Sequence, residues 1–145
     1  MDVKKTGKGL YVHTCVLEKG FVKAGDKVVA KVDKAPRRAT EANHSAAHLM
    51  QAALRKVLGD HVHQSGSYVD SERCRFDFTH FSAMTAEELA KVEELVNDAI
   101  AEAMDVTTQE MSMDDAKKSG AIALFGEKYG DVVRVVKAGD FSTEL

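Results

Sequence analysis

Cysteine, proline and tryptophan are scarce in this chain, and long apolar runs are missing. Its 145 residues include two cysteines, one proline and no tryptophan. Cys15 and Cys74 stand far apart, which excludes a disulfide framework and favours a reducing compartment. The longest apolar run, residues 121–125, is far shorter than the ~20 residues that span a membrane, and the first residues do not show the apolar stretch of a secretory signal peptide. We therefore expect a globular cytoplasmic protein with no membrane partner.

Charge is unevenly distributed along the chain, although the formal net charge is only −3. Residues 1–38 carry ten Lys and Arg against four acidic residues, a net charge of +6, whereas residues 85–145 carry a net charge of −8. Such polarity is typical of a protein that binds a polyanion at one end. Lysine-rich strand edges and solvated acidic helices would give the same pattern without a partner, so the charge alone leaves both interpretations open.

The hydrophobic pattern predicts an α+β fold. Short or alternating apolar stretches predict strands at residues 10–17, 27–33, 61–69, 73–79, 106–112 and 132–136. Helical spacing predicts helices at residues 40–58, 85–104 and 114–119. Thr85 and Glu88 form a capping box at the start of the second helix, Gly59 is expected to end the first, and Pro36 is expected to close an N-terminal antiparallel lobe.

Core positions follow from the same spacing. The first long helix collects Ala47, Met50, Leu54, Val57 and Leu58, and the second collects Leu89, Val92, Val96, Ile100 and Ala103. In the strand at 73–79, Cys74, Phe76 and Phe78 alternate with charged residues, which predicts a half-buried strand in which Cys74 is a core residue.

His44 and His48 are the first candidates for chemistry. They stand four residues apart on a predicted helix, so their rings project from one face and could share a metal ion. Two ordinary surface histidines would show the same spacing. A zinc peptidase needs a glutamate after the first histidine, where this chain has Ser45. The pair alone therefore leaves both interpretations open, and a zinc site would need further ligands.

Four ordered motifs resemble the editing region of alanyl-tRNA synthetases, of the threonyl/alanyl-tRNA synthetase second additional domain type. They are NHSAAHL at 43–49, HVHQSGS at 61–67, RFDFTH at 75–80 and GAIALFGEKYGDVVRVV at 120–136. Residues 10–39 resemble the small β-barrel lobe that precedes this region. The resemblance implies a small antiparallel β-barrel lobe over residues 1–38 and an editing core over residues 39–145, with an antiparallel sheet packed with helices. The family's Cys-x-x-x-His zinc motif would follow FSTEL at 141–145, so we expect a C-terminally truncated fragment.

The resemblance also implies a reaction and its residues. Editing domains of this family hydrolyse the ester of serine or glycine wrongly joined to tRNA(Ala), while the parent ligase joins alanine to tRNA(Ala) with ATP. Gln64, Ser45 and Ser67 match polar positions and are the expected catalytic residues. His44 and His48 match two zinc ligands, so the zinc site would be incomplete in this fragment. The implied partners are mischarged tRNA(Ala) and the rest of the parent synthetase.

Several expectations concern neighbouring residues. His80 matches the family pattern but is expected to be structural, and Asp77 is expected to pair with a neighbouring arginine. The basic residues Lys34, Arg37 and Arg38 are expected to lie beside the tRNA acceptor end. Two alternatives remain, a free-standing trans-editing deacylase and a non-catalytic zinc- or tRNA-binding module. The segment GEKYGD at 126–131 favours the synthetase-embedded version over the free-standing one.

Overall fold

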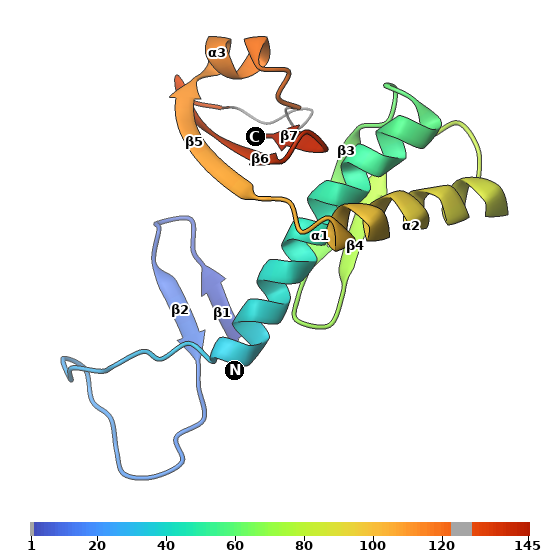
Figure 1. Ribbon diagram of the computed structural model, residues 1–145. Helices are drawn as coiled ribbons and strands as arrows, with labels where there is room; N and C mark the ends of the chain where they lie inside the picture. Colours follow the sequence, from blue (N-terminus) through green and yellow to red (C-terminus); the bar gives the residue numbers. More distant parts are fainter. Residues whose placement is uncertain (1, 123–128) are drawn as a thin grey trace. The chain divides into compact units, whose positions relative to one another are not determined.

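The computed structural model describes residues 2–122 and 129–145, which form two compact units (Figure 1). The first unit ends at Val32 and the second runs from Asp33 to Leu145, so the domain boundary predicted at residue 38 falls inside the second unit. Met1 and residues 123–128, which include part of the fourth motif, lie outside the described residues. None of the described helices combines the length and the hydropathy of a membrane-spanning segment.

The first unit is a two-stranded hairpin followed by an extended segment. β1 (Asp2–Lys5), which the sequence did not predict, pairs with β2 (Tyr11–Thr14) in antiparallel register. The strand predicted at 27–33 is absent, and Val28 and Val29 remain 77% and 83% exposed. A strand needs a partner for its backbone groups, and β1 and β2 pair with each other. The described residues of this unit therefore form a hairpin instead of the closed barrel expected for residues 1–38.

The second unit is built on α1 (Lys34–Leu58), which begins earlier than the helix predicted at 40–58. The Asp33 carboxylate caps it by accepting a hydrogen bond from the backbone N–H of Ala35 at 3.1 Å. Pro36 lies in the first turn, where a backbone N–H has no partner within the helix, so the proline ring does not interrupt it. Pro36 thus belongs to α1 and does not close the preceding lobe. Gly59, at φ 111°, ends the helix as predicted.

The main core lies where α1 packs against α2 (Ala86–Ala101) and the antiparallel hairpin of β3 (Gln64–Val69) and β4 (Cys74–Phe78). Its buried residues are Ala53, Leu54, Val62 and Val92. The capping box is confirmed, because the Glu88 N–H donates to Thr85 Oγ1 at 3.2 Å and the Thr85 N–H donates to the Glu88 carboxylate at 2.8 Å.

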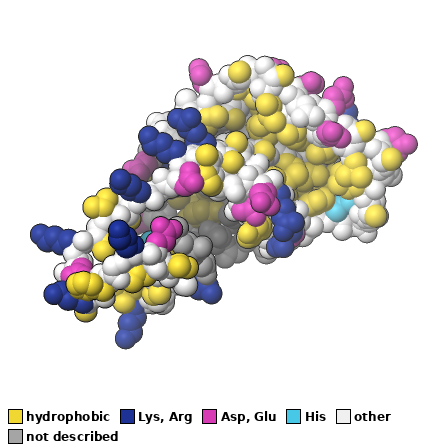
Figure 2. Space-filling model, turned by 90° about the horizontal axis from the view of Figure 1, so that it is seen from below, with side chains coloured by type: hydrophobic (Ala, Val, Ile, Leu, Met, Phe, Trp, Pro, Cys, Tyr) yellow, Lys and Arg dark blue, Asp and Glu magenta, His cyan; other side chains and the backbone are white. Residues whose placement is uncertain are grey.

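The face of α2 that is buried is narrower than the sequence predicts. Leu89 and Ile100, expected in the core, remain 54% and 55% exposed, and Ala103 lies beyond the end of the helix. α2 lies along one side of α1 (Figure 1), so part of its apolar stripe stays at the surface. Figure 2 shows hydrophobic side chains gathered on one face of the surface.

A three-stranded antiparallel sheet completes the unit, with strand order β5 (Val106–Ser112), β6 (Val132–Ala138) and β7 (Ser142–Glu144). Val133 and Val135 pack with Ala116 of α3 (Met113–Lys118) in a second small core. β7 was not predicted, because three residues are too few to show a period of two. It lies next to α1, the helix that carries His44 and His48.

Candidate functional site

The histidine pair is the centre of the candidate site. His44 and His48 lie one turn apart on α1, and their ring centroids are 4.8 Å apart in an edge-to-face arrangement. His48 Nδ1 contacts a carboxylate oxygen of Glu144, which comes from β7. The helix thus supplies the spacing predicted from the sequence, while the strand adds an acidic partner.

A cavity of about 310 Å³, here called the histidine cavity, lies beside this pair. It is bordered by α1, the β3–β4 hairpin and strands β6 and β7. Its lining residues are His44, Ala47, His48, Gln51, Gln64, Ser67, Val69, Phe76, Ile122, Arg134, Val136, Glu144 and Leu145. The structure therefore brings together four predicted site residues, His44, His48, Gln64 and Ser67, from separate elements.

A β-bulge explains how Gln64 and Ser67 line the same cavity. In a regular strand, residues three apart point to opposite faces. Here Gln64 pairs with Phe78 and Gly66 pairs with Asp77, so β3 uses one more residue than β4 at this point. Because of this extra residue, Gln64 and Ser67 lie on the same face of β3, and both side chains line the histidine cavity.

The other residues of the motif at 61–67 lie partly in the core and partly at the surface. Val62 is fully buried in the main core, and the ring of His61 forms a 2.9 Å contact from Nε2 to Nδ1 of His80. His80 thus has His61 as a partner, its structural role stays a prediction, and neither histidine lines the histidine cavity. Asp77 also behaves as predicted, because Arg75 Nε lies 3.1 Å from its carboxylate.

Three polar residues of the histidine cavity were missed by sequence reasoning. Gln51 is 3% exposed and lies one turn after His48, so the helical repeat could have indicated it. Arg134 interrupts the apolar run of β6, and its side chain points to the face of the strand opposite that of the buried Val133. A single charged residue in such a run could have indicated a functional position. Glu144 carried no signal, because its position depends on the pairing of β7.

Positive charge and partial burial favour the neutral form of His44. Partial burial lowers the pKa of this imidazole below its ordinary value, and the nearby His48 and Arg134 lower it further, while Glu144 opposes the shift. A neutral imidazole is the form that can bind a metal ion.

An open cleft of about 610 Å³, here called the outer cleft, adjoins the histidine pair. Arg37 and Arg134 line it together with Ser45. Ser45 is the one predicted catalytic residue outside the histidine cavity, and its hydroxyl donates to the Glu41 backbone carbonyl at 3.1 Å. The Arg37 guanidinium bonds the Glu41 carboxylate at 2.6 Å.

Lys34 and Arg38 are exposed on the first turns of α1. Together with Arg37 they place the predicted tRNA-contacting residues on the same helix as the histidine pair. The Arg134 guanidinium, from β6, has a long contact of 3.5 Å to Thr108 Oγ1. Charge suited to an anionic ligand therefore lies on both α1 and β6.

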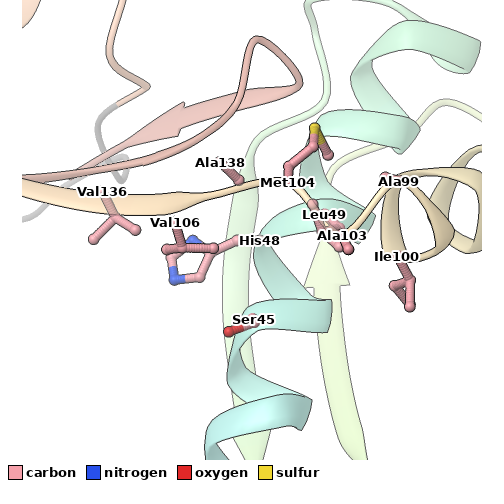
Figure 3. Close-up of a pocket in the computed structure, with 10 residues that line it drawn as sticks. All are labelled: Ser45, His48, Leu49, Ala99, Ile100, Ala103, Met104, Val106, Val136 and Ala138. Atoms are coloured by element: carbon pink, nitrogen blue, oxygen red, sulfur yellow. The ribbon is translucent and has the colours of Figure 1, made fainter.

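His48 also lines a smaller pocket (Figure 3). It has a volume of about 150 Å³ and is lined mainly by apolar side chains from α1, α2, β5 and β6. Figure 3 shows the His48 ring beside Val106, with Ser45 one turn away on α1.

His44 and His48 are the two nitrogen donors that the candidate site could offer to a metal ion. Zinc sites in proteins use three or four protein ligands. Among residues 2–122 and 129–145, no three histidine, cysteine or acidic side chains are grouped so that they could hold a metal ion. Among the described residues, the histidine pair thus has no grouped third ligand for a metal ion.

Comparison with known proteins gives close relatives over the entire chain. The chain is 56% identical over 145 residues to an alanine–tRNA ligase of Acetivibrio thermocellus, covering 100% of the chain and 16% of that protein. It is 58% identical over 144 residues to alanine–tRNA ligase 1 of Lachnoclostridium phytofermentans, covering 99% of the chain and 16% of the relative. For the alanine–tRNA ligase of Desulfitobacterium hafniense, the identity is 57% over 145 residues, 17% of that protein.

No protein-family model matches the chain. The relatives nevertheless agree with the resemblance carried by the four motifs, and the chain spans about a sixth of their length. By its sequence, the chain is related over its whole length to a segment of alanine–tRNA ligases.

Proposed function

We propose that this chain is the editing unit of an alanine–tRNA ligase and hydrolyses the ester that links serine or glycine to tRNA(Ala). The relatives are named for joining alanine to tRNA, and editing serves that process by removing wrong products. The observation that carries the proposal is the convergence of His44, His48, Gln64 and Ser67 on one cavity.

Elementary recognition chemistry explains why such a ligase needs editing. Glycine lacks one methyl group of alanine, a difference worth about 1–3 kcal/mol in a binding pocket. Serine adds one hydroxyl to alanine, and an apolar pocket rejects such an analogue by only about 100-fold. Binding alone therefore leaves errors that a second, hydrolytic site can remove.

The editing cavity has to admit serine while sparing alanine, which is smaller. Size cannot make this distinction, so the serine hydroxyl has to be recognised by hydrogen bonds. Gln64 offers both an amide donor and a carbonyl acceptor, and Ser67 offers a hydroxyl. Both side chains line the histidine cavity. We assign them to recognition of the serine hydroxyl, and Ser45 to the entrance of the outer cleft.

Hydrolysis requires an oriented water molecule. The water oxygen attacks the ester carbonyl carbon, the bond from that carbon to the ribose oxygen breaks, and the ribose oxygen takes up a proton. Gln64 has no accessible basic form, so its contribution is orientation and not proton abstraction. His44 and His48 would hold zinc, which when bound supplies a Lewis acid that polarises the carbonyl or lowers the pKa of water toward ~7.

The acceptor end of tRNA is a polyanion, and we assign its phosphates to the basic residues of α1 and β6. Lys34, Arg37 and Arg38 are exposed on the first turns of α1, and Arg134 borders both the histidine cavity and the outer cleft. Arginine and lysine side chains in such positions hold phosphates and fix the position of a nucleic acid. In this proposal they place the ester bond in the histidine cavity.

The proposal is tested with a full-length alanine–tRNA ligase that contains this chain as its corresponding segment. Hydrolysis of Ser-tRNA(Ala), Gly-tRNA(Ala) and Ala-tRNA(Ala) is followed under single-turnover conditions. We expect rapid loss of the first two esters and slow loss of the third. Binding of tRNA without hydrolysis of Ser-tRNA(Ala) would instead identify a non-catalytic tRNA-binding module.

A further inference from the structure

Glu144 is a buried acidic residue that the proposed reaction does not use. The residue is 3% exposed, and carboxylates are seldom buried unless their oxygens are paired. One carboxylate oxygen contacts His48 Nδ1, and the other accepts a hydrogen bond from the Ser142 hydroxyl at 3.1 Å. Both oxygens of this carboxylate are therefore paired.

The backbone around Glu144 is fixed from two sides. In the sheet, Glu144 pairs with Val136 of β6. On its other side, the Leu145 N–H donates to the Ile122 carbonyl at 3.1 Å, and the Ile122 N–H donates to the Thr143 carbonyl at 2.9 Å. A strand held along both edges keeps the carboxylate at a constant position relative to His48.

This arrangement determines which nitrogen of a neutral His48 carries the proton. A carboxylate only accepts hydrogen bonds, so the nitrogen that faces it has to be a donor. The proton therefore sits on Nδ1, and Nε2 keeps the lone pair with which a histidine binds a metal ion. The same contact fixes the orientation of the ring.

We propose that Glu144 is the positioning residue of the site, which holds His48 in the Nδ1–H tautomer with Nε2 available to zinc. This inference rests on the zinc ligation by His48 in the proposed function. Glu144 itself does not touch the metal or the substrate in this assignment. Outer carboxylates of this kind typically raise metal affinity by about 10- to 100-fold.

The tautomer is measured without zinc or tRNA, by ¹⁵N NMR of the histidine side chains of the 145-residue chain. At a pH where the ¹⁵N shifts show a neutral ring, we expect the Nδ1–H form of His48. Glu144→Met, which keeps the length of the side chain but removes the acceptor, should move the proton toward Nε2. Glu144→Gln keeps a carbonyl acceptor and should retain the Nδ1–H form. Glu93→Ala, at an exposed position on α2, controls for loss of a negative charge.

Zinc titration of the same samples supplies a second readout. We expect Glu144→Met to weaken zinc binding by about 10- to 100-fold, with a smaller effect for Glu144→Gln and none for Glu93→Ala. Should Glu144→Met be unfolded, the tautomer of the unsubstituted chain and the zinc affinity of Glu144→Gln still decide the question.

Three results would overturn the assignment. The first is an Nε2–H tautomer in the unsubstituted chain. The second is unchanged zinc binding in both Glu144 variants. The third is a loss of zinc from Glu144→Gln as large as that from His48→Ala, which would make Glu144 a direct ligand. None of these readouts depends on ester hydrolysis, so failure of the positioning role is distinguishable from failure of the deacylase proposal.

Discussion

Replacing Gln64 by alanine separates recognition of the serine hydroxyl from the other contributions of the cavity. Gln64 is only partly buried and stands outside both cores, so its truncation should change the free energy of unfolding by no more than about 0.5 kcal/mol. For a domain of this size, that change shifts the melting temperature by roughly 1–2 °C. We therefore expect the Gln64→Ala chain to remain folded.

The kinetic effect should be much larger than the effect on stability. A polar group left without its partner in a closed site costs about 1–3 kcal/mol, which corresponds to a decrease of roughly 5- to 150-fold in rate. Glycine has no hydroxyl, so hydrolysis of Gly-tRNA(Ala) should decrease less than hydrolysis of Ser-tRNA(Ala). An equal decrease for both esters would assign Gln64 to orientation of the water alone.

The assay compares single-turnover hydrolysis of the two esters by the full-length ligase with thermal melting of the 145-residue chain. Gln109→Ala is the matched control, because Gln109 is an exposed glutamine on β5 that does not line the histidine cavity. It should leave both rates unchanged. If Gln64→Ala hydrolyses Ser-tRNA(Ala) at the original rate, or if it unfolds the chain, the role given to Gln64 is refuted.

Three further predictions address the basic helix, an acidic loop and the metal. Exchanging Arg37 and Arg38 for glutamate should weaken tRNA binding and reduce its salt dependence by roughly one unit of slope for each phosphate that is no longer neutralised; an unchanged slope, measured by titration at several salt concentrations, would contradict the placement. Two backbone N–H groups, 2.8 and 2.9 Å from the Asp70 carboxylate, lower its pKa, so its contribution to stability is present above the unfolded-state value of ~3.9 and is lost as the pH falls through the lower folded-state value. Urea unfolding of Asp70→Asn should therefore approach that of the unsubstituted chain as the solution is acidified, and a constant difference would exclude this linkage. With two histidine donors, the chain should bind zinc weakly, and zinc-induced NMR shifts should vanish in His48→Ala; tight stoichiometric zinc that survives this substitution would require other ligands.

Local patterns in the sequence were sufficient for features that depend on neighbours along the chain. The i, i+4 spacing of His44 and His48 placed both rings on one helix face, because helix geometry alone fixes that relation. The capping box of Thr85 and Glu88 was predictable for the same reason. Local reasoning erred at Pro36, since a proline ends a helix in its interior but is accepted in its first turn.

Long-range pairing decided the rest of the candidate site. The bulge in β3 that brings Gln64 and Ser67 to one cavity exists only in register with β4, and the absent strand at 27–33 lacked a partner to pair with. Glu144 stands 96 positions after His48, so only the docking of β7 beside α1 could bring its carboxylate to the imidazole. The residues alone were enough to predict the histidine pair and the relationship to alanine–tRNA ligases. The tertiary structure decided which polar groups surround that pair, because contacts between distant segments depend on strand register and packing that no local pattern encodes.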